Sequence, residues 1–352
     1  MPGFGSTAGS KFQMSVGWRQ ARITESYNGH FVNRDFSHTW MPYERMSIMD
    51  VSARYIVNRR VSLLATLPIV SNNFSMLYPP NGPGGGVRHG TNANGIGDLS
   101  IFEQTTLLNP RDHPFENIAL GVGMKIPTGD WNVQGDLPNL TGTGFMRRAI
   151  YPPAIMPGDG GTGIIFGVNG FKNFRKNLLL RGNVIFGSAT YLSNPRDQNG
   201  TNSIVSGLGV PLAPQFLNRL TNSVTDSYNV QIGTSIKIPG VWDKPRLKPF
   251  RGRLTFNCEG IPNRDLFGRS DGFRQSGHIF SVAPGFTYTK GNGLFICEVP
   301  LVFSRYINAN KSAIPDLNQN PDGSLSPAAF NPKVNLGMVP AAAISMRYVR
   351  TF

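Results

Sequence analysis

Apolar and polar residues alternate with a period of two in many parts of this sequence. Every second residue is apolar in KFQMSVGW (11–18) and in most of YNVQIGTSIK (228–237) and RGRLTFNCEG (251–260). The last residues, AAISMRYVRTF (342–352), alternate in the same way and end on Phe352. Successive side chains of a β-strand point to opposite faces. These stretches therefore predict strands with one apolar face and one polar face.

Twelve such strands are predicted along the 352 residues of the chain. They cover approximately residues 11–20, 48–57, 60–70, 97–109, 117–127, 162–171, 178–189, 227–238, 249–260, 276–289, 293–306 and 337–352. Glycine (41) and proline (27) are frequent, which favours turns over long helices. The sequence contains no continuous apolar run of about 20 residues, so no transmembrane helix is predicted.

The connections between these strands alternate in length. The long ones are 21–47, 71–96, 128–161, 190–226, 261–275 and 307–336, and the shorter ones follow residues 57, 109, 171, 238 and 289. In an up-and-down meander, successive connections lie at opposite ends of the sheet. All the long connections are therefore expected at one end and the short turns at the other.

The polar face of the strands carries charged residues, and this decides which face is the outside. A barrel of twelve strands is too wide for small side chains alone to fill it. An apolar exterior around a polar interior is the arrangement of transmembrane barrels, and closure pairs every backbone group, as lipid requires. We therefore predict an all-β fold, a single transmembrane antiparallel up-and-down β-barrel of twelve strands. Trp18, Tyr348 and Phe352 are expected in the aromatic girdles at the membrane surfaces.

Residues 1–10 are expected to form an N-terminal periplasmic segment, and residues 11–352 the barrel with long extracellular loops. The expected location is the bacterial outer membrane of a Gram-negative cell, with a signal peptide already removed.

The stretch GIGDLSIFEQTTLLNPRDHPFENIALGVGMKIPTGDW (95–131) resembles a family of outer-membrane transport barrels associated with phenol and toluene degradation. The shared pattern is a Gly-Asp pair opening a strand, here at 97–98, and an apolar strand ending in Pro-Thr-Gly, here at 127–129. The segment PGDGGTGIIFGVNGFKNF (157–174) resembles the Pro-Gly-x-Gly segment of the same family. The resemblance implies an outer-membrane channel for small, often hydrophobic, organic molecules. The glycines and Pro127 are interpreted as structural residues at strand ends.

The inward-facing positions of the predicted strands carry more basic than acidic residues. The predicted pore-lining residues are Asp50, Arg54, Lys125, Arg181, Lys237, Arg251, Arg253, Glu259, Glu298 and Arg347. They form either a pore wall that favours anions or electron-rich aromatic solutes, or a set of salt bridges that brace and block the lumen. Arg251 and Arg253 are expected to present a positive surface to the pore, because Glu298 falls on a strand that is not their neighbour.

Three apolar, proline-rich segments lie in the long connections, at 76–86, 137–146 and 151–161. They are interpreted either as a constriction folded into the mouth of the barrel or as surface loops.

No catalytic site is expected, so the chain is predicted not to be an enzyme. His278 and Ser281 are three residues apart on a strand and so point to opposite faces, and no nucleophile elbow is present. Phosphate-binding, dinucleotide-binding and zinc-binding motifs are also absent. The calcium-like spacing of acidic and amide residues in 316–322 has Pro321 where the turn glycine belongs. No cofactor or metal is therefore expected.

The leading hypothesis is a channel for passive uptake of small organic solutes, hydrophobic, aromatic or anionic. The alternative is a structural or assembly barrel with a plugged lumen that binds a protein partner through its loops or its basic periplasmic turns. Those turns carry Arg59, Arg60, Arg175, Lys176, Lys244, Arg246 and Lys248. The expected partners are the lipid bilayer, lipopolysaccharide and a small organic solute. The net charge of +14 comes from scattered residues, so no nucleic acid is expected, and the oligomeric state stays open.

Overall fold

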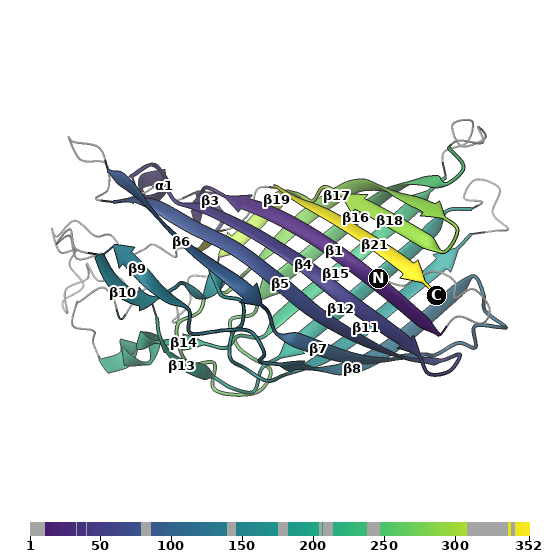
Figure 1. Ribbon diagram of the computed structural model, residues 1–352, viewed down its shortest axis with the longest axis horizontal. Coiled ribbons are helices and arrows are strands. Elements are labelled where there is room, and N and C mark those ends of the chain that lie inside the picture. The colour runs from purple at the N-terminus through teal and green to yellow at the C-terminus, as the bar shows by residue number, and fades with distance from the viewer. Residues whose placement is uncertain are drawn as a thin grey trace.

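The computed structural model describes residues 11–32, 34–39, 41–78, 86–138, 146–174, 182–203, 206, 214–237, 247–307, 337–338 and 342–352. These residues form a closed antiparallel barrel with smaller sheets at one end (Figure 1). No helix in this part of the chain is long and apolar enough to cross a membrane.

Twelve strands make up the barrel wall, as predicted. In order around the wall they are β1 (Phe12–Ile23), β4 (Tyr43–Ile56), β5 (Val61–Tyr78), β7 (Leu99–Thr106) with β6 (Val87–Ile96), β8 (Glu116–Ile126), β11 (Gly163–Asn173), β12 (Val184–Ser193), β15 (Ser227–Ile236), β16 (Phe250–Ile261), β17 (Gly277–Lys290), β18 (Gly293–Glu298) with β19 (Leu301–Ile307), and β21 (Ala342–Thr351). The barrel closes because β1 pairs with both β4 and β21, with Val16 opposite Val51 and Tyr348. The alternating C-terminal stretch of the sequence is therefore the closing strand.

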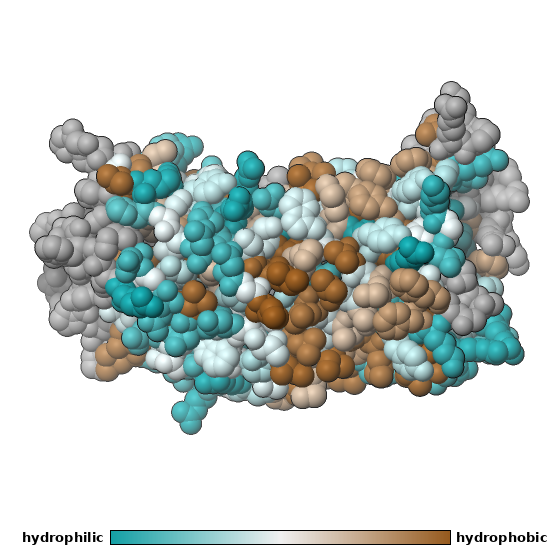
Figure 2. Space-filling view, in the orientation of Figure 1, coloured by the Kyte–Doolittle hydropathy of each residue, from teal (hydrophilic) through white to brown (hydrophobic). Residues whose placement is uncertain are grey.

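The apolar face of the wall points outward, as the alternation predicts. Val16, Val230, Phe256 and Tyr348, which were expected on the outside, are 44%, 36%, 43% and 45% exposed. Figure 2 shows the resulting hydrophobic surface over the middle and right of the barrel, with hydrophilic residues gathered towards the left. A soluble barrel would bury this face, so the outward belt supports the transmembrane interpretation.

The two ends of the barrel differ, and we call them the loop end and the turn end. The small elements gather at the loop end, on the left of Figure 1, and the C terminus lies at the turn end on the right. One small sheet at the loop end consists of β2 (Ser26–Asn28), β3 (Phe31–Val32) and β20 (Gly337–Met338). Two strand pairs lie there as well, β9 (Gln134–Pro138) with β10 (Met146–Ile150) and β13 (Gln198–Asn202) with β14 (Thr221–Ser223). The remaining loop-end elements are the helix α1 (Arg34–Thr39) and the 3-10 helices η1 (Pro153–Ile155) and η3 (Pro214–Leu220). The segregation of long and short connections is thus as expected.

The prediction that 71–96 forms a long connection is wrong. β5 continues to Tyr78 and pairs with β6 along residues 87–96, which extends the wall at the loop end. The inward side chains of this extension, Phe74 and Met76, are buried against Ile155. Contact with another loop, which the alternation alone does not show, thus stabilises the longer hairpin.

Two strands of the wall are interrupted. β6 and β7 both pair with β5, but the ladder breaks at Gly97 and Asp98. β18 and β19 both pair with β17, and the break falls at Val299 and Pro300. Proline has no N–H group, so it cannot donate to a ladder. The first break coincides with the Gly-Asp pair that the sequence placed at a strand start.

One long connection folds into the barrel. Ile155 of η1 is fully buried and packs against Phe74, Met76 and Ala93 of the wall. The side-chain amide of Asn72, on the inner face of β5, donates to the carbonyl of Ile155 at 3.2 Å. The η1 part of segment 151–161 therefore packs on the inner face of the wall at the loop end, which supports the constriction interpretation of this segment. The other two proline-rich segments, 76–86 and 137–146, fall largely outside the described residues.

Candidate functional site in the barrel lumen

One lumen space lies towards the loop end, and we call it the upper cavity. Its volume is about 630 Å³, and its lining comes from β1, β4, β12, β15–β19 and β21, with Ala154 of η1. One part of the lining is apolar, formed by Ile23, Met46, Ile48, Ile279, Ile296 and Val302. Another part is polar, formed by Ser188, Thr190, Asn229, Gln231 and Asn257. Such a mixed lining can bind a small molecule that has an apolar body and a polar group.

A second space, the lower cavity, lies towards the turn end. Its volume is about 170 Å³, and its lining includes Gln13, Ser52, Arg54 and Thr66. The upper and lower cavities have Ile296 and Arg347 in common. These two side chains therefore lie between the two cavities. Arg347 has room there because its register partner on β1 is Gly17, where an added Cβ would lie 3.4 Å from the Arg347 Nε atom.

Carboxyl groups outnumber basic groups in the lining of the upper cavity. The carboxyl residues are Glu44, Asp50, Glu259 and Glu298, and the basic residues are Arg19 and Arg347. Asp50 is 3.8 Å from Arg19. Sequence analysis predicted the opposite balance, because it counted inward basic residues along the whole barrel. The structure distributes these residues unevenly, and Arg54, Lys125, Lys237, Arg251 and Arg253 are not part of this lining.

The three motifs of the family resemblance come together beside the break in the wall. Asp98 accepts a hydrogen bond from the Gly129 N–H at 3.0 Å and another from the Asp159 N–H at 3.3 Å. The Thr128 hydroxyl donates to the Gly97 carbonyl at 2.8 Å. The Gly-Asp, Pro-Thr-Gly and Pro-Gly-x-Gly segments thus form one clamp, which attaches the inward segment 151–161 to the wall. The interpretation of these residues as structural agrees with this arrangement.

Lys125 is the charged centre of this clamp. Its ammonium group contacts the carboxylate of Asp159 and lies 3.7 Å from that of Asp98, and the Lys125 side chain is 8% exposed. Lys125 was predicted to line a pore, with a salt bridge as the alternative. The structure supports the salt bridge at this position.

Two glycines permit the close contact in the clamp. A Cβ on Gly129 would lie 2.8 Å from the Cα of Gly158, and a Cβ on Gly158 would lie 2.7 Å from a carboxylate oxygen of Asp98. No side chain fits at either distance, so only glycine allows the two segments to approach so closely.

Arg253 belongs to a second buried group. Its Nε atom donates to Glu298 at 2.7 Å, its guanidinium lies 4.0 Å from the centre of the Phe186 ring, and the hydroxyl of Thr255 also contacts Glu298. The expectation that Arg253 has no carboxylate beside it is wrong. Glu298 reaches it across the inner face of β17, where the facing residue of that strand is Gly285. An intervening strand does not separate two long inward side chains when its own inward residue is small.

The other predicted pore-lining residues lie in different places. Arg54 lines the lower cavity and donates to Gln104 at 3.1 Å. Arg251 donates to the Gly182 carbonyl at 2.6 Å, and the Lys237 N–H donates to Asn183 at 2.9 Å, both near the turn end. Asp50, Glu259, Glu298 and Arg347 line the upper cavity. Arg181 lies outside the described residues. The role of these residues in a pore stays a prediction.

Sequence analysis missed Glu44 and Arg19 in the cavity lining. Arg19 lies within the predicted strand 11–20 and continues the inward parity of Gln13 and Ser15, so parity alone would have placed it on the inner face. Glu44 was assigned to a long connection, because the hydropathy pattern is reversed there: the inward Met46 and Ile48 are apolar and the outward Arg45 and Ser47 are polar. Strand ends are the least reliable part of such a prediction.

His278 and Ser281 lie on opposite faces of β17, as expected. Ser281 lines the upper cavity, whereas the ring of His278 stacks on Tyr306 and meets Phe280 edge-on. Among the residues that the structure describes, no three His, Cys, Asp or Glu side chains form a metal-binding group.

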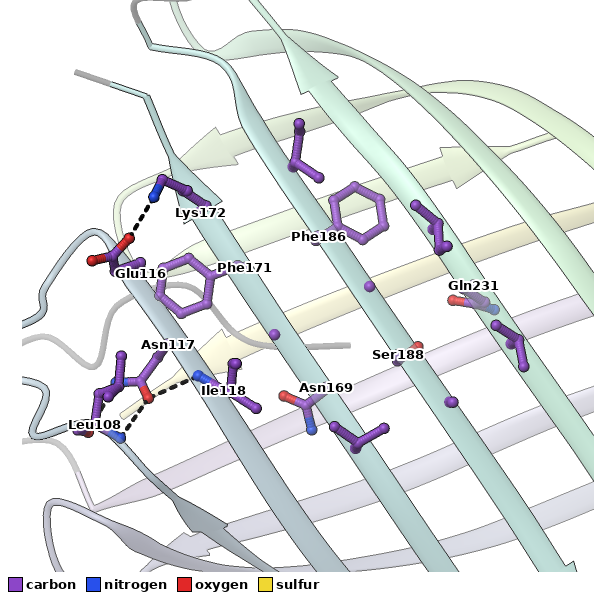
Figure 3. A pocket seen from close by; sticks show the side chains of 17 residues that line it. Leu108, Glu116, Asn117, Ile118, Asn169, Phe171, Lys172, Phe186, Ser188 and Gln231 are labelled. Atoms are coloured by element: carbon purple, nitrogen blue, oxygen red, sulfur yellow. Dashed lines mark hydrogen bonds and ion pairs between the residues drawn. The ribbon is translucent and has the colours of Figure 1, made fainter. Parts of the chain in front are cut away.

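An apolar groove of about 580 Å³ follows the outer face of β8, β11, β12 and β15 (Figure 3). Its outward side chains include Ile118, Ile185 and Ile232, which are 48%, 45% and 58% exposed. At one edge the ammonium of Lys172 lies 2.9 Å from the carboxylate of Glu116. The groove is part of the outward apolar belt of the wall.

The described geometry is that of an outer-membrane type of β-barrel, and comparison with solved structures agrees. The chain is similar to the COG4313 outer membrane channel from Pseudomonas putida F1, with a TM-score of 0.54 and 12% identity over 100% of this chain and 99% of that chain. The beta domain of the Bordetella autotransporter BrkA gives a TM-score of 0.45 and 10% identity over 97% of this chain and 100% of that chain. The Ralstonia pickettii toluene transporter TbuX gives a TM-score of 0.42 and 11% identity over 98% of this chain and 90% of that chain.

No model of a known protein family and no curated protein matches this sequence. The likeness to the first of these structures therefore concerns the fold. It confirms the expected resemblance to outer-membrane transport barrels at that level.

Proposed function

We propose that this protein is a passive channel of the bacterial outer membrane for small organic solutes. The observation that carries this proposal is the pair of lumen cavities, which meet at Arg347 and Ile296. In this proposal solutes enter the upper cavity, pass Arg347 and leave through the lower cavity. The long connections face the outside of the cell, and residues 1–10, the short turns and the C terminus face the periplasm.

The lining of the upper cavity suits organic solutes better than inorganic ions. Apolar side chains such as Ile23 and Ile279 lie in the same cavity as amides such as Gln231. A hydrated inorganic ion gains no binding energy from the apolar surface, whereas a small organic molecule can cover this surface and remove it from water. The preference for anionic solutes that was expected from Arg251 and Arg253 is no longer supported. Arg253 is paired with Glu298, and the upper cavity is rich in carboxyl groups.

Replacement of Arg347 by Ala tests the path. We expect the single-channel conductance in planar bilayers to increase, because the variant removes the side chain that stands between the cavities. We also expect the reversal potential in a salt gradient to shift towards cation selectivity, because Asp50 and Glu298 would remain near the passage. Arg45→Ala, which removes an exposed charge from the outward parity of β4, serves as the control. An unchanged conductance and reversal potential in Arg347→Ala would contradict the proposed path.

The second candidate function is a barrel that does not conduct and that binds a protein partner. The inward segment 151–161 favours this candidate, because it occupies part of the lumen and is held there by the Lys125 clamp. Basic residues at the turn end, including Arg59, Arg60 and Lys248, would suit an acidic partner or anionic lipid headgroups. Conductance separates the candidates, since only the channel conducts without removal of the segment.

A further inference from the structure

Glu44 is a buried carboxyl group with one oxygen unpartnered among the described residues. The residue lies near the loop end of β4, is 2% exposed and lines the upper cavity. Its Oε1 atom is buried and accepts no hydrogen bond from the residues that the structure describes. Burial of a carboxyl group without a partner is destabilising. Glu44 therefore lies in a position where a bound molecule would supply a missing interaction.

The surroundings of Glu44 are apolar. Its register partners on the two neighbouring strands are Ile23 and Phe74, which are 3% and 9% exposed. Met46, the next inward residue of β4, also lines the cavity. A molecule whose polar group reached Glu44 would thus place its body against apolar side chains. This points to an amphipathic ligand.

The arginines of the cavity are too far along the wall to satisfy Glu44. Glu44 faces Ile23 on β1, whereas Arg347 faces Gly17 of the same strand. A strand rises about 3.3 Å per residue, so these two positions are roughly 20 Å apart along β1. Arg19 is nearer, but it lies beside Asp50. On the far wall, Glu259 adds a second carboxylate, whose nearest hydrogen-bonding contact is the Asn229 amide at 3.5 Å.

A protonated amine matches this site better than a hydroxyl group does. An ammonium group has three donors and a positive charge, whereas a hydroxyl has one donor and no charge. Hydrogen bonds between charged groups are about twice as strong as those between neutral groups. The amine would also experience the excess of carboxyl groups in the cavity lining.

We propose that the upper cavity is a binding site for small amphipathic amines, with Glu44 as the residue that receives the ammonium group and so determines specificity. This inference deepens the proposed channel function and rests on it for the direction of transport. Binding itself is independent of conductance, and the test uses that difference.

Isothermal titration of the folded full-length barrel in detergent tests the site with three probes that share one ring. The probes are benzylamine, protonated at neutral pH, benzyl alcohol and benzoate. We expect the wild-type protein to bind benzylamine most tightly. Glu44→Gln should weaken benzylamine binding by roughly tenfold, with the affinity for benzyl alcohol nearly unchanged, because glutamine keeps the shape and a carbonyl acceptor but has no charge.

Glu116→Gln provides the matched control, because Glu116 is a half-exposed carboxylate on the outer wall and its loss should leave all three affinities unchanged. Glu44→Met serves as a second variant, which fills the site with an apolar side chain and should also remove the preference for benzylamine. Heat-modifiable gel mobility verifies that each variant is folded.

Two results would overturn the proposal. One is a wild-type protein that binds benzyl alcohol or benzoate at least as tightly as benzylamine, and the other is an unchanged preference in both Glu44 variants. Conductance of the same preparations in planar bilayers distinguishes the hypotheses. A conducting barrel without the amine preference removes the site but leaves the channel, and a barrel that binds benzylamine through Glu44 without conducting removes the channel but leaves the site.

Discussion

Replacement of Lys125 by Met should lower the free energy of unfolding by roughly 3 kcal/mol, because removal of one partner of a buried ion pair leaves its counter-charges without compensation. Lys125 is 8% exposed and is the only cation recorded beside the carboxylates of Asp98 and Asp159 in the described part of the chain. We take the low end of the range known for such changes, because Asp159 is 37% exposed and water can hydrate it in the variant. Urea titration of the barrel folded in phospholipid vesicles measures the difference.

The same variant should change the lumen. The clamp attaches segment 151–161 to the wall, and without Lys125 two carboxylates would face each other at close range. We expect the segment to leave its place for part of the time, which would produce larger and more variable single-channel currents. Lys172→Met is the matched control, since it breaks a salt bridge with Glu116 in which both side chains are well exposed. Such surface pairs contribute little to stability. Equal destabilisation by the two substitutions would show that the clamp does not depend on the buried charge.

The barrel itself could be predicted because its signal is repeated in every strand. Residues such as Val16, Val230 and Phe256 follow a period of two, and a single parity decides the outside for the whole wall. The closing strand was also visible in the sequence, since the pairing of β1 with β21 needs only that the first and last strands lie at the open edges. Local patterns of this kind do not depend on how loops pack.

The contents of the lumen could not be predicted in the same way. The motifs around Asp98, Gly129 and Asp159 were recognised, but nothing in their spacing places them in one clamp. Their convergence depends on a connection that turns back into the barrel. The pairing of Arg253 with Glu298 depends in turn on Gly285, whose missing side chain leaves the inner face of β17 open between them. Contacts across several strands are set by side-chain length and by gaps, and alternation carries no information on either.

Replacement of Phe256 by Arg should lower the free energy of unfolding in lipid vesicles by roughly 2–4 kcal/mol, the cost of an arginine on the lipid face near the bilayer midplane. Phe256 lies in the middle of β16, is 43% exposed on the outer face and has Val282 and Ile232 beside it on the neighbouring strands. Its ring also stacks on that of Phe280 at 5.9 Å, so the variant loses an aromatic contact as well.

The control for Phe256→Arg is the next residue. Asn257 lines the upper cavity and donates to the Ser281 hydroxyl at 3.3 Å, so Asn257→Arg places the same side chain in the polar lumen. We expect this variant to change stability far less and to reduce the conductance, since the new side chain occupies the cavity. The two substitutions introduce the same side chain one residue apart, on opposite faces of the strand. If both substitutions lower the free energy of unfolding in vesicles by the same amount, the outer face of β16 is not in contact with lipid. The assignment of the apolar face to the membrane then fails, and so does the proposed channel that depends on it.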